Sequence, residues 1–268
     1  MSVIYDLGAN RGDNLPYFLS RADLVVAVEA NPALVREMNS KYSNVINDGR
    51  LKVINCALSD CPSDSIPFSV NLKDSHISAL NPSASRNSSD FEVINVPAMT
   101  IVDLIADHGS PYYIKIDLEG YDPCVLSQLF EAKIFPDYLS TEAHTTLPFA
   151  LIDESGIYNS YQIMDARKFS AISFAYPGQS DVNLAPGCFH EGTSGPFGTD
   201  IPSPWMSSRQ CLTNLAIAGL GWRDIHARKQ HPDSDARVYL ENFPLRSLAS
   251  ALARKLVPNS WLKPKFFM

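Results

Sequence analysis

The sequence contains no long hydrophobic run, because no stretch approaches the roughly eighteen consecutive apolar residues that a membrane-spanning helix needs. It also shows no signal peptide: a predicted strand begins at once, and charge arrives too early for an apolar leader. The 268 residues are 45% hydrophobic, which is enough for a substantial core. We therefore expect one large or two small folded domains.

Cysteines are few and follow no metal-binding or disulfide pattern. The five are odd in number and include no C-x-x-C pair: Cys56, Cys61, Cys124, Cys188 and Cys211. They fit buried thiols in a reducing cytoplasm better than disulfides or zinc. Basic residues are also in deficit, and the net charge of −7 gives no global case for nucleic-acid binding.

The first functional signal is the stretch VIYDLGANRG, residues 3–12. An apolar strand runs into a turn with Gly8 and Gly12, and helix-forming sequence follows. A strand, a tight loop and a helix N-terminus together place backbone N–H groups against a ligand. A second apolar run, residues 24–28, ends at Glu29, where an acid can accept both hydroxyls of a ribose. These features predict half of a nucleoside site; a bare turn with glycines for packing is the alternative.

The glycine spacing indicates which nucleoside binds. A dinucleotide fingerprint needs G-x-G-x-x-G because the pyrophosphate must approach the backbone closely, whereas this chain has G-x-x-x-G. Asp6 precedes the loop and Asp13 follows it. These carboxylates would repel a pyrophosphate but suit a ligand with an ammonium and a sulfonium. We therefore predict S-adenosylmethionine rather than NAD, bound by Asp6, Gly8, Asn10, Gly12 and Glu29.

A third predicted strand, residues 51–55, leads into CALSD at the same edge of the sheet. We expect this loop to flank the adenine through Ala57 and Leu58. Asp60 either hydrogen-bonds the base or is a solvated turn acid.

The stretch 61–98 breaks the alternation of strands and helices, and its two apolar runs predict an inserted hairpin around a polar loop. Helix starts are predicted on either side of it. Asn31 precedes a proline at a first helical position, and Thr100 has Asp103 three residues on.

Charged residues alternate with apolar ones over a predicted strand at residues 112–118. Period-two alternation puts Lys115, Asp117 and Glu119 on one face, which is costly in a central parallel strand unless the charges pair or do chemistry. An ion pair of Lys115 with Asp117 beside a solvated Glu119 is the simpler alternative.

The next predicted strand ends in Glu142 and His144, also at the carboxyl edge. Asp117 and Glu119 would therefore converge with them where an open α/β sheet places its ligands. Carboxylates with one imidazole could also hold magnesium or manganese, and His144 could instead be structural. We assign no metal ligands.

The motifs DLGANRG, VEANP, CALSD, IKIDLEGYDPCVL and STEAH, in this order within residues 1–145, resemble FkbM-family methyltransferases. The resemblance implies a class I methyltransferase fold: a Rossmann-like, seven-stranded, mostly parallel sheet with helices on both faces and its last strand antiparallel. It implies S-adenosylmethionine-dependent O-methylation of a hydroxyl on a sugar, glycan or natural product. It also implies that Asp6, Gly8 and Glu29 hold the cofactor.

O-methylation needs a base, because the acceptor hydroxyl loses its proton as the bond forms. We expect His144 to be that base, then Glu119 or Asp117, with Glu142 in the same group and Lys115 orienting the carboxylates. The alternative function is a non-catalytic methyltransferase-like module that binds a membrane or glycan-assembly partner.

A lid is predicted between the last two strands, residues 161–165 and 222–227, which are antiparallel neighbours in this fold. It covers residues 171–220, and its segment 177–204 holds five glycines and five prolines, typical of an ordered functional loop. GTSGPFG at residues 192–198 is similar to a subgroup of FkbM-like proteins. The residues expected to contact the acceptor are His190, Ser194, Phe197, Trp205 and His226. A rigid surface loop is the alternative.

The C-terminal stretch 244–268 carries five basic residues and no acidic one, with leucines at helical spacing. A basic amphipathic helix can bind an anionic membrane surface or a protein partner, or pack on the acidic surface of its own chain. We predict a methyltransferase domain at residues 1–228 and an extension at 229–268, in a cytoplasmic protein that the extension could attach to a membrane.

Overall fold

The structure, a computed structural model, describes residues 1–80, 88–165, 189, 193–201 and 204–229. Its strands are β1 (Val3–Leu7), β2 (Leu24–Glu29), β3 (Leu51–Asn55), β4 (Ala57–Leu58), β5 (Ser63–Asn71), β6 (Phe91–Met99), β7 (Tyr113–Ile116), β8 (Tyr138–Ala143), β9 (Tyr158–Asp165) and β10 (Gly221–Lys229). Its α-helices are α1 (Leu15–Leu19), α2 (Pro32–Lys41), α3 (Ser43–Asn47), α4 (Ile101–His108), α5 (Asp122–Glu131), α6 (Leu147–Glu154) and α7 (Ser208–Ala218). Short 3-10 turns are η1 (Ser75–Ile77), η2 (Ser88–Asp90) and η4 (Gly198–Asp200).

Seven strands form the central sheet in the order β3-β2-β1-β7-β8-β10-β9. β10 is antiparallel to both of its neighbours, and the other pairs are parallel. The expected seven-stranded sheet with its last strand antiparallel is thus confirmed. Chain order reverses between β1 and β7, and open α/β sheets bind ligands in the crevice at such a point.

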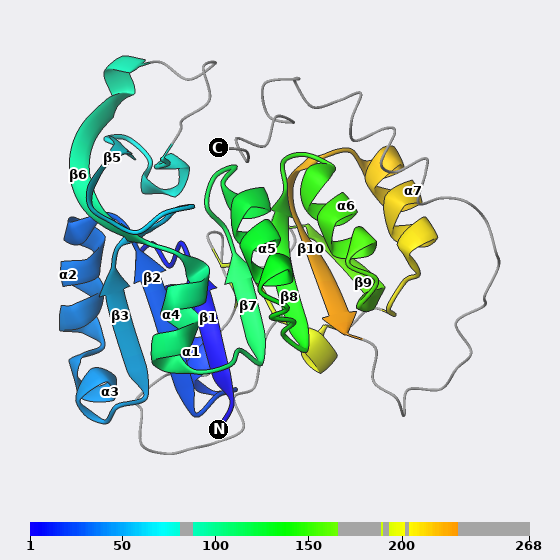
Figure 1. Ribbon diagram of the computed structural model, residues 1–268, viewed down its shortest axis with the longest axis horizontal. Coiled ribbons are helices and arrows are strands. Elements are labelled where there is room, and N and C mark those ends of the chain that lie inside the picture. The colour runs from blue at the N-terminus through cyan, green and yellow to red at the C-terminus, as the bar shows by residue number, and fades with distance from the viewer. Residues whose placement is uncertain (81–87, 166–188, 190–192, 202–203, 230–268) are drawn as a thin grey trace.

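Helices cover both faces of this sheet. α4, α5 and α6 lie side by side in front of it in Figure 1 and bury their apolar residues, with those of α7, in one core. α1, α2 and α3 pack on the opposite face, together with described residues of the segment 189–201. The apolar content of the sequence is therefore divided between two cores on either side of one sheet.

Two helix starts form where the sequence predicts them. The Asn31 side chain accepts a hydrogen bond from the backbone N–H of Ala33 at 2.9 Å, and Pro32 opens α2. The Thr100 hydroxyl oxygen accepts one from the N–H of Asp103 at 3.1 Å, at the start of α4. Each cap satisfies a backbone donor that a helix leaves without an intrahelical partner.

The predicted inserted hairpin is also confirmed. β5 and β6 pair antiparallel, β4 adds to β6 in parallel, and the three form a second, small sheet. In Figure 1 this sheet rises above the carboxyl ends of β2 and β3. Its residues Phe68, Val96 and Ala57 pack against Ala30, which directly follows β2.

β7 is shorter than predicted and ends at Ile116. The predicted strand end at residue 118 is therefore wrong, and Glu119 does not continue the strand, whereas Asp117 still pairs with Lys115 at 3.0 Å. The N–H of Asp117 still bonds to the carbonyl of Leu7 at 3.1 Å, but Glu119 takes a φ of 52° and Gly120 one of 100°. These left-handed conformations turn the chain away from the sheet.

The region predicted as a lid includes a regular element of the fold. α7 packs on β9 and buries Cys211 and Leu215 in the core that it shares with α5 and α6. Within the described residues, no helix is long and apolar enough to cross a membrane. The basic stretch 244–268 lies outside the described residues, so the domain boundary and the proposed membrane contact stay predictions.

Phe197 anchors the segment 193–201 on the sheet. It is 5% exposed, and its ring stacks on that of Tyr113 with centroids 4.0 Å apart. Tyr17 and Phe18 of α1 meet it edge-on at 5.7 and 6.1 Å. Aromatic pairs in such arrangements stabilise a fold beyond the area that they bury.

Replacing Phe197 with alanine should lower the free energy of unfolding by about 3–5 kcal/mol, because a buried ring would leave a cavity. Chemical denaturation of the full chain measures the change. Ile217→Ala is the matched control, since Ile217 is 80% exposed. Equal midpoints for the two variants would contradict the packing role of Phe197.

Candidate active site

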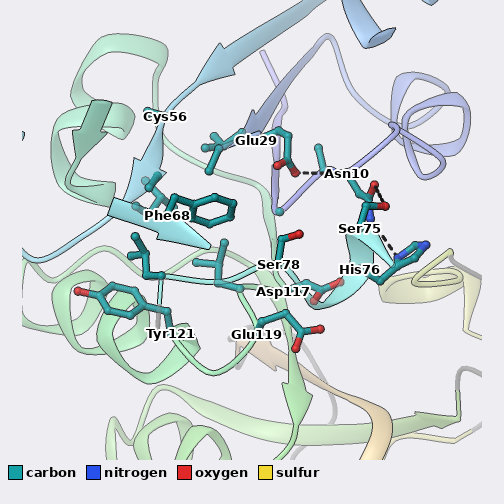
Figure 2. A pocket seen from close by; sticks show the side chains of 18 of the residues that line it. Asn10, Glu29, Cys56, Phe68, Ser75, His76, Ser78, Asp117, Glu119 and Tyr121 are labelled. Atoms are coloured by element: carbon teal, nitrogen blue, oxygen red, sulfur yellow. Dashed lines mark hydrogen bonds between the residues drawn. The ribbon is translucent and has the colours of Figure 1, made fainter. Parts of the chain in front are cut away.

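A cavity of about 780 Å³, its open mouth included, lies at the carboxyl ends of β1, β2 and β7. The glycine loop after β1 and the loop after β7 form two of its walls, and the β5–β6 hairpin forms a third (Figure 2). The lining residues predicted from the sequence are Gly8, Asn10, Asp13, Glu29, Ala57, Leu58, Lys115, Asp117 and Glu119. The cavity therefore brings together most of the predicted cofactor residues, but Asp6 and Gly12 do not line it.

Gly8 passes so close to the end of β7 that no side chain fits. A Cβ atom there would lie 2.0 Å from the carbonyl oxygen of Asp117, and its φ of 81° already favours glycine. Gly12, with a φ of 74°, packs in the same way against Leu15 and Tyr42. Close packing of the loop therefore requires glycine at both positions.

The loop does not offer the backbone donors that its pattern predicts. The N–H groups of Gly8 and Ala9 donate to the carbonyl of Val28 at 3.0 and 2.9 Å. That of Asn10 donates to Glu29, and that of Gly12 to the carbonyl of Ala9 at 2.8 Å. The expectation that these N–H groups face a ligand is therefore wrong for these four. A loop with its donors occupied disfavours a pyrophosphate and tolerates a cationic ligand.

Glu29 is held rigidly at the end of β2, where it is 8% exposed. Its two carboxylate oxygens accept the N–H groups of Asn31 at 2.8 Å and Asn10 at 2.9 Å. Burial raises its pKa, and the two backbone hydrogen bonds oppose that shift. Each oxygen keeps a further lone pair, so the carboxylate can still accept ligand hydroxyls.

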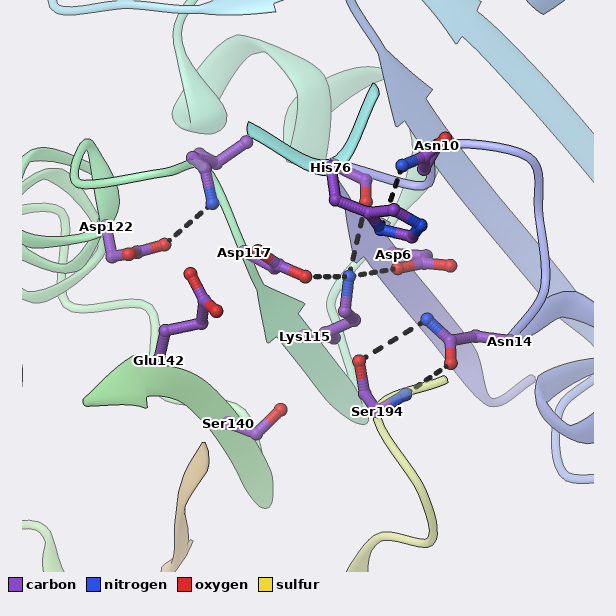
Figure 3. Close-up of polar contacts among 12 residues, drawn as sticks. Asp6, Asn10, Asn14, His76, Lys115, Asp117, Asp122, Ser140, Glu142 and Ser194 are labelled. Carbon is purple, nitrogen blue, oxygen red and sulfur yellow. Dashed lines mark hydrogen bonds and ion pairs between the residues drawn. The ribbon is translucent and has the colours of Figure 1, made fainter. Parts of the chain in front are cut away.

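Lys115 is a residue of β7 and is 3% exposed. Its side chain lies between β1 and the loop after β7. Its ammonium contacts Asp6 Oδ1 at 3.2 Å and Asp117 Oδ2 at 3.0 Å, and donates to the carbonyl of Gly8 at 3.2 Å (Figure 3). Burial alone would lower its pKa, but Asp117 and Asp6 outweigh burial and raise it, so the group stays a cation. The ion pair with Asp117 is confirmed.

Polar residues continue across the sheet at the level of Lys115, as the pairing of the strands shows. Five residues at one level occupy adjacent strands, and all of them are buried: Asp6, Lys115, Ser140, His226 and Gln162. Burial lowers the pKa of His226 to about 3, so its imidazole is neutral. Its Nε2 has no hydrogen-bond partner among the described residues.

Beyond this row, acidic side chains gather at the edge of the sheet. His144 Nε2 lies 2.7 Å from Glu142 Oε2, and donor atoms of Glu119, Glu142 and His144 all lie within 4.8 Å of one another. Burial and then the charge of Asp117 raise the pKa of Glu142 to about 7. The hydrogen bond to Glu142 raises that of His144 to about 9, against the opposing effect of burial.

Two further acids face this group. Burial and the charge of Glu142 raise the pKa of Asp122, whose Oδ1 accepts the N–H of Leu118 at 3.0 Å (Figure 3). Burial and the charge of Glu142 also raise the pKa of Asp224 on β10. The pKa values are raised because each negative charge disfavours the ionisation of its neighbour. Carboxylates with raised pKa values of this kind concentrate at functional sites.

Comparison with known protein families identifies the family of this chain. Residues 6–169, more than half of the chain, match the methyltransferase FkbM domain. The chain belongs to the FkbM methyltransferase family. A comparison with curated protein sequences finds no match.

Solved structures give only weak likenesses to this FkbM methyltransferase. The FkbM methyltransferase from Methylobacillus flagellatus KT is 17% identical, with a TM-score of 0.39, over 60% of this chain and 39% of its own. A second structure is that of geranyl diphosphate C-methyltransferase from Streptomyces coelicolor A3(2), solved with Mg²⁺, geranyl diphosphate and S-adenosyl-L-homocysteine. It is 9% identical, with a TM-score of 0.39, over 86% of this chain and 74% of its own. At these values neither structure indicates an acceptor. The chain spans less than two thirds of the Methylobacillus protein.

The described residues among those predicted to contact the acceptor do not line the cavity. Ser194 donates its N–H to Asn14 Oδ1 at 2.8 Å, and Phe197 is a packing residue with a buried ring. Trp205 packs beside Tyr138, with centroids 6.3 Å apart. None of these three lines the cavity among the described residues, and neither does the buried His226. His190 lies outside the described residues.

A magnesium or manganese site stays an untested alternative. Glu119, Glu142 and His144 offer suitable donors. Glu142 and His144 form an ion pair, and this 2.7 Å contact accounts for both charges.

Sequence reasoning missed several lining residues that come from distant segments. Ser75, His76 and Ser78 reach the cavity from the hairpin, and Tyr121 reaches it from the start of α5. Asn14 forms part of the same wall. Only Asn14 carried a signal, because it directly follows the glycine loop; the others depend on tertiary contacts.

Replacing Lys115 with methionine should destabilise the FkbM domain by about 3–5 kcal/mol, because it leaves Asp6 and Asp117 buried without their cation. The shift of the denaturation midpoint measures the loss. Lys52→Met on β3, an exposed lysine, serves as control. A midpoint no lower than the control's would show that the charge cluster does not depend on Lys115.

Proposed function

We propose that this FkbM-family chain transfers a methyl group from S-adenosylmethionine to a hydroxyl oxygen of a sugar, glycan or other natural product. The observation that carries the proposal is the charge of the cavity. Glu29, Asp13, Asp117 and Glu119 line it, while the N–H groups of the glycine loop are occupied. Such a site suits a nucleoside with a sulfonium and an ammonium, and family membership supports the same cofactor.

In this proposal the cofactor methyl faces the loop after β7. Methyl transfer is an in-line displacement, so the protein chiefly positions the two reactants. Asp117 and Glu119 lie where the cavity meets the acidic edge of the sheet, next to Glu142 and His144. An acceptor bound over this edge would find carboxylates that hydrogen-bond hydroxyl groups, which favours a polyhydroxylated molecule.

The geometry favours Glu142 as the base of this proposed reaction. His144, the first choice from the sequence, is protonated at neutral pH, because its pKa is raised to about 9 beside Glu142. Glu142 has a pKa near 7, where a carboxylate can both lose and accept a proton. His144 then orients Glu142 and stabilises its charged form.

The first test concerns the cofactor. Replacing Glu29 with glutamine should weaken S-adenosylhomocysteine binding about tenfold or more, because a charged acceptor for the ribose hydroxyls is lost. Titration calorimetry of the full chain measures both affinities. Glu37→Gln, an exposed glutamate on α2, should leave binding unchanged. If the native protein binds neither S-adenosylmethionine nor S-adenosylhomocysteine, the proposed function is wrong.

The second test concerns the base. Methyl transfer to a sugar acceptor, found by screening glycosides with radiolabelled S-adenosylmethionine, should speed up as pH rises through about 7. Above that pH Glu142 is ionised in the folded protein. Glu142→Gln should lower turnover about 10²–10⁴-fold and leave cofactor affinity intact.

The matched control for the base is Glu154→Gln at the exposed end of α6. A Glu142→Gln variant with full turnover and an unchanged pH profile would remove Glu142 from the mechanism. Cofactor binding without transfer to any glycoside would instead favour the non-catalytic module.

A further inference from the structure

The cofactor cavity has two chemically different ends, with Glu29 between them (Figure 2). Phe68, Cys56 and Tyr121 form the apolar end. Asn10, Ser75 and His76 form the polar end, on the opposite side of Glu29. S-adenosylmethionine has the same polarity along its length: a flat base, then a ribose, then an amino acid.

This polarity fixes the direction of the ligand, on the basis of the function proposed above. With the ribose hydroxyls on Glu29, the adenine lies against the apolar end. The amino-acid portion then extends toward Asn10 and His76. Its ammonium meets acids on the way, because Asp13 and Asp117 both line the cavity.

The carboxylate of the amino acid needs donors, and the glycine loop does not supply them. The N–H groups of Gly8, Ala9, Asn10 and Gly12 already donate to protein acceptors. Among the residues described around the cavity, Lys115 and His76 are the two basic side chains. Lys115 is occupied by two carboxylates and a carbonyl.

The remaining donors form a chain at the polar end. The Ser75 hydroxyl donates to Asn10 Oδ1 at 3.1 Å, and Asn10 Nδ2 lies 3.1 Å from His76 Nδ1. Because Asn10 Oδ1 accepts from Ser75, its Nδ2 is the donor toward the imidazole. The Nδ1 atom of His76 therefore accepts, and the Nε2–H group is the remaining donor of the ring. Asp74 fixes the turn by accepting the N–H of His76 at 3.0 Å. The hairpin thus places hydroxyl, amide and imidazole groups together.

We propose that the β5–β6 hairpin supplies the carboxylate subsite of the cofactor, in which His76 donates its Nε2–H group beside the second Nδ2–H of Asn10. The hairpin then selects the intact amino acid, whereas Glu29 selects the ribose. The hairpin is thereby a specificity-determining part of the cofactor site and not only its cover.

The test compares S-adenosylhomocysteine with its decarboxylated analogue by titration calorimetry on the full chain. The native protein should prefer S-adenosylhomocysteine. His76→Phe should weaken that ligand about fivefold, as expected for a partly solvated hydrogen bond to a carboxylate, and leave the analogue unchanged. His76→Gln should keep the preference, because its side-chain amide keeps an N–H donor at the same place. His108→Phe on α4 should change neither affinity.

Three outcomes would overturn the subsite. Equal weakening of both ligands by His76→Phe would show a general effect on the pocket wall. Unchanged affinity of His76→Phe for S-adenosylhomocysteine would show that His76 does not contact the carboxylate. A His76→Gln variant as weak as His76→Phe would exclude a role for the N–H donor. If the native protein binds neither ligand, the proposed function itself fails, and the subsite with it.

Discussion

The three contacts of the Lys115 ammonium are the constraint on which the rest of the site depends. They join β1 through Asp6, the loop after β7 through Asp117, and the glycine loop through the carbonyl of Gly8. A lone charge in this buried position would be prohibitively costly, so the cation and its two carboxylates require one another. Because Gly8 can approach Asp117 only without a side chain, the ion pairs and the glycine hold the same geometry.

That geometry explains why the cavity favours cations. One ammonium is shared by Asp6 and Asp117, so this cluster keeps a net negative charge. The glycine loop donates its N–H groups inward, to Val28 and Glu29, and so adds no positive field. A cationic cofactor completes the charge balance of such a site. The acids beyond it, around Glu142, respond by resisting ionisation, which brings a carboxylate pKa into the range where proton transfer is effective.

Local signals in the sequence predicted the fold well. Asn31 and Thr100 cap helices through their own side chains, and Glu29 ends β2, because these features depend on a few neighbouring residues. The end of β7 was not predictable from the charge pattern. β7 ends at Ile116 although the alternation of charges continues, because Glu119 and Gly120 adopt left-handed conformations that the alternation does not encode.

Burial also decided the roles of side chains that the pattern left open. Phe197 has the chemistry of a sugar platform, yet its ring packs on Tyr113. No pattern in the sequence marks His76, which lies in a polar loop, yet the hairpin brings it to Asn10 across 66 residues of chain. A sequence shows which groups are present, whereas the direction of a backbone N–H or the face of a ring is set by tertiary packing.

The register of the sheet adds a property that no single strand contains. Ser140, His226 and Gln162 come from three strands, and each alone is an ordinary buried polar residue. Pairing places them at the level of Lys115, so that polar groups continue from the cofactor side of the sheet to its far edge. A buried polar row costs stability unless its members are hydrogen-bonded. Two members of the row have partners that offset this cost: the Ser140 hydroxyl lies 2.6 Å from that of Tyr113, and Lys115 pairs with Asp6 and Asp117. The polar row is thus held by contacts inside the sheet, on the same ammonium that fixes the glycine loop.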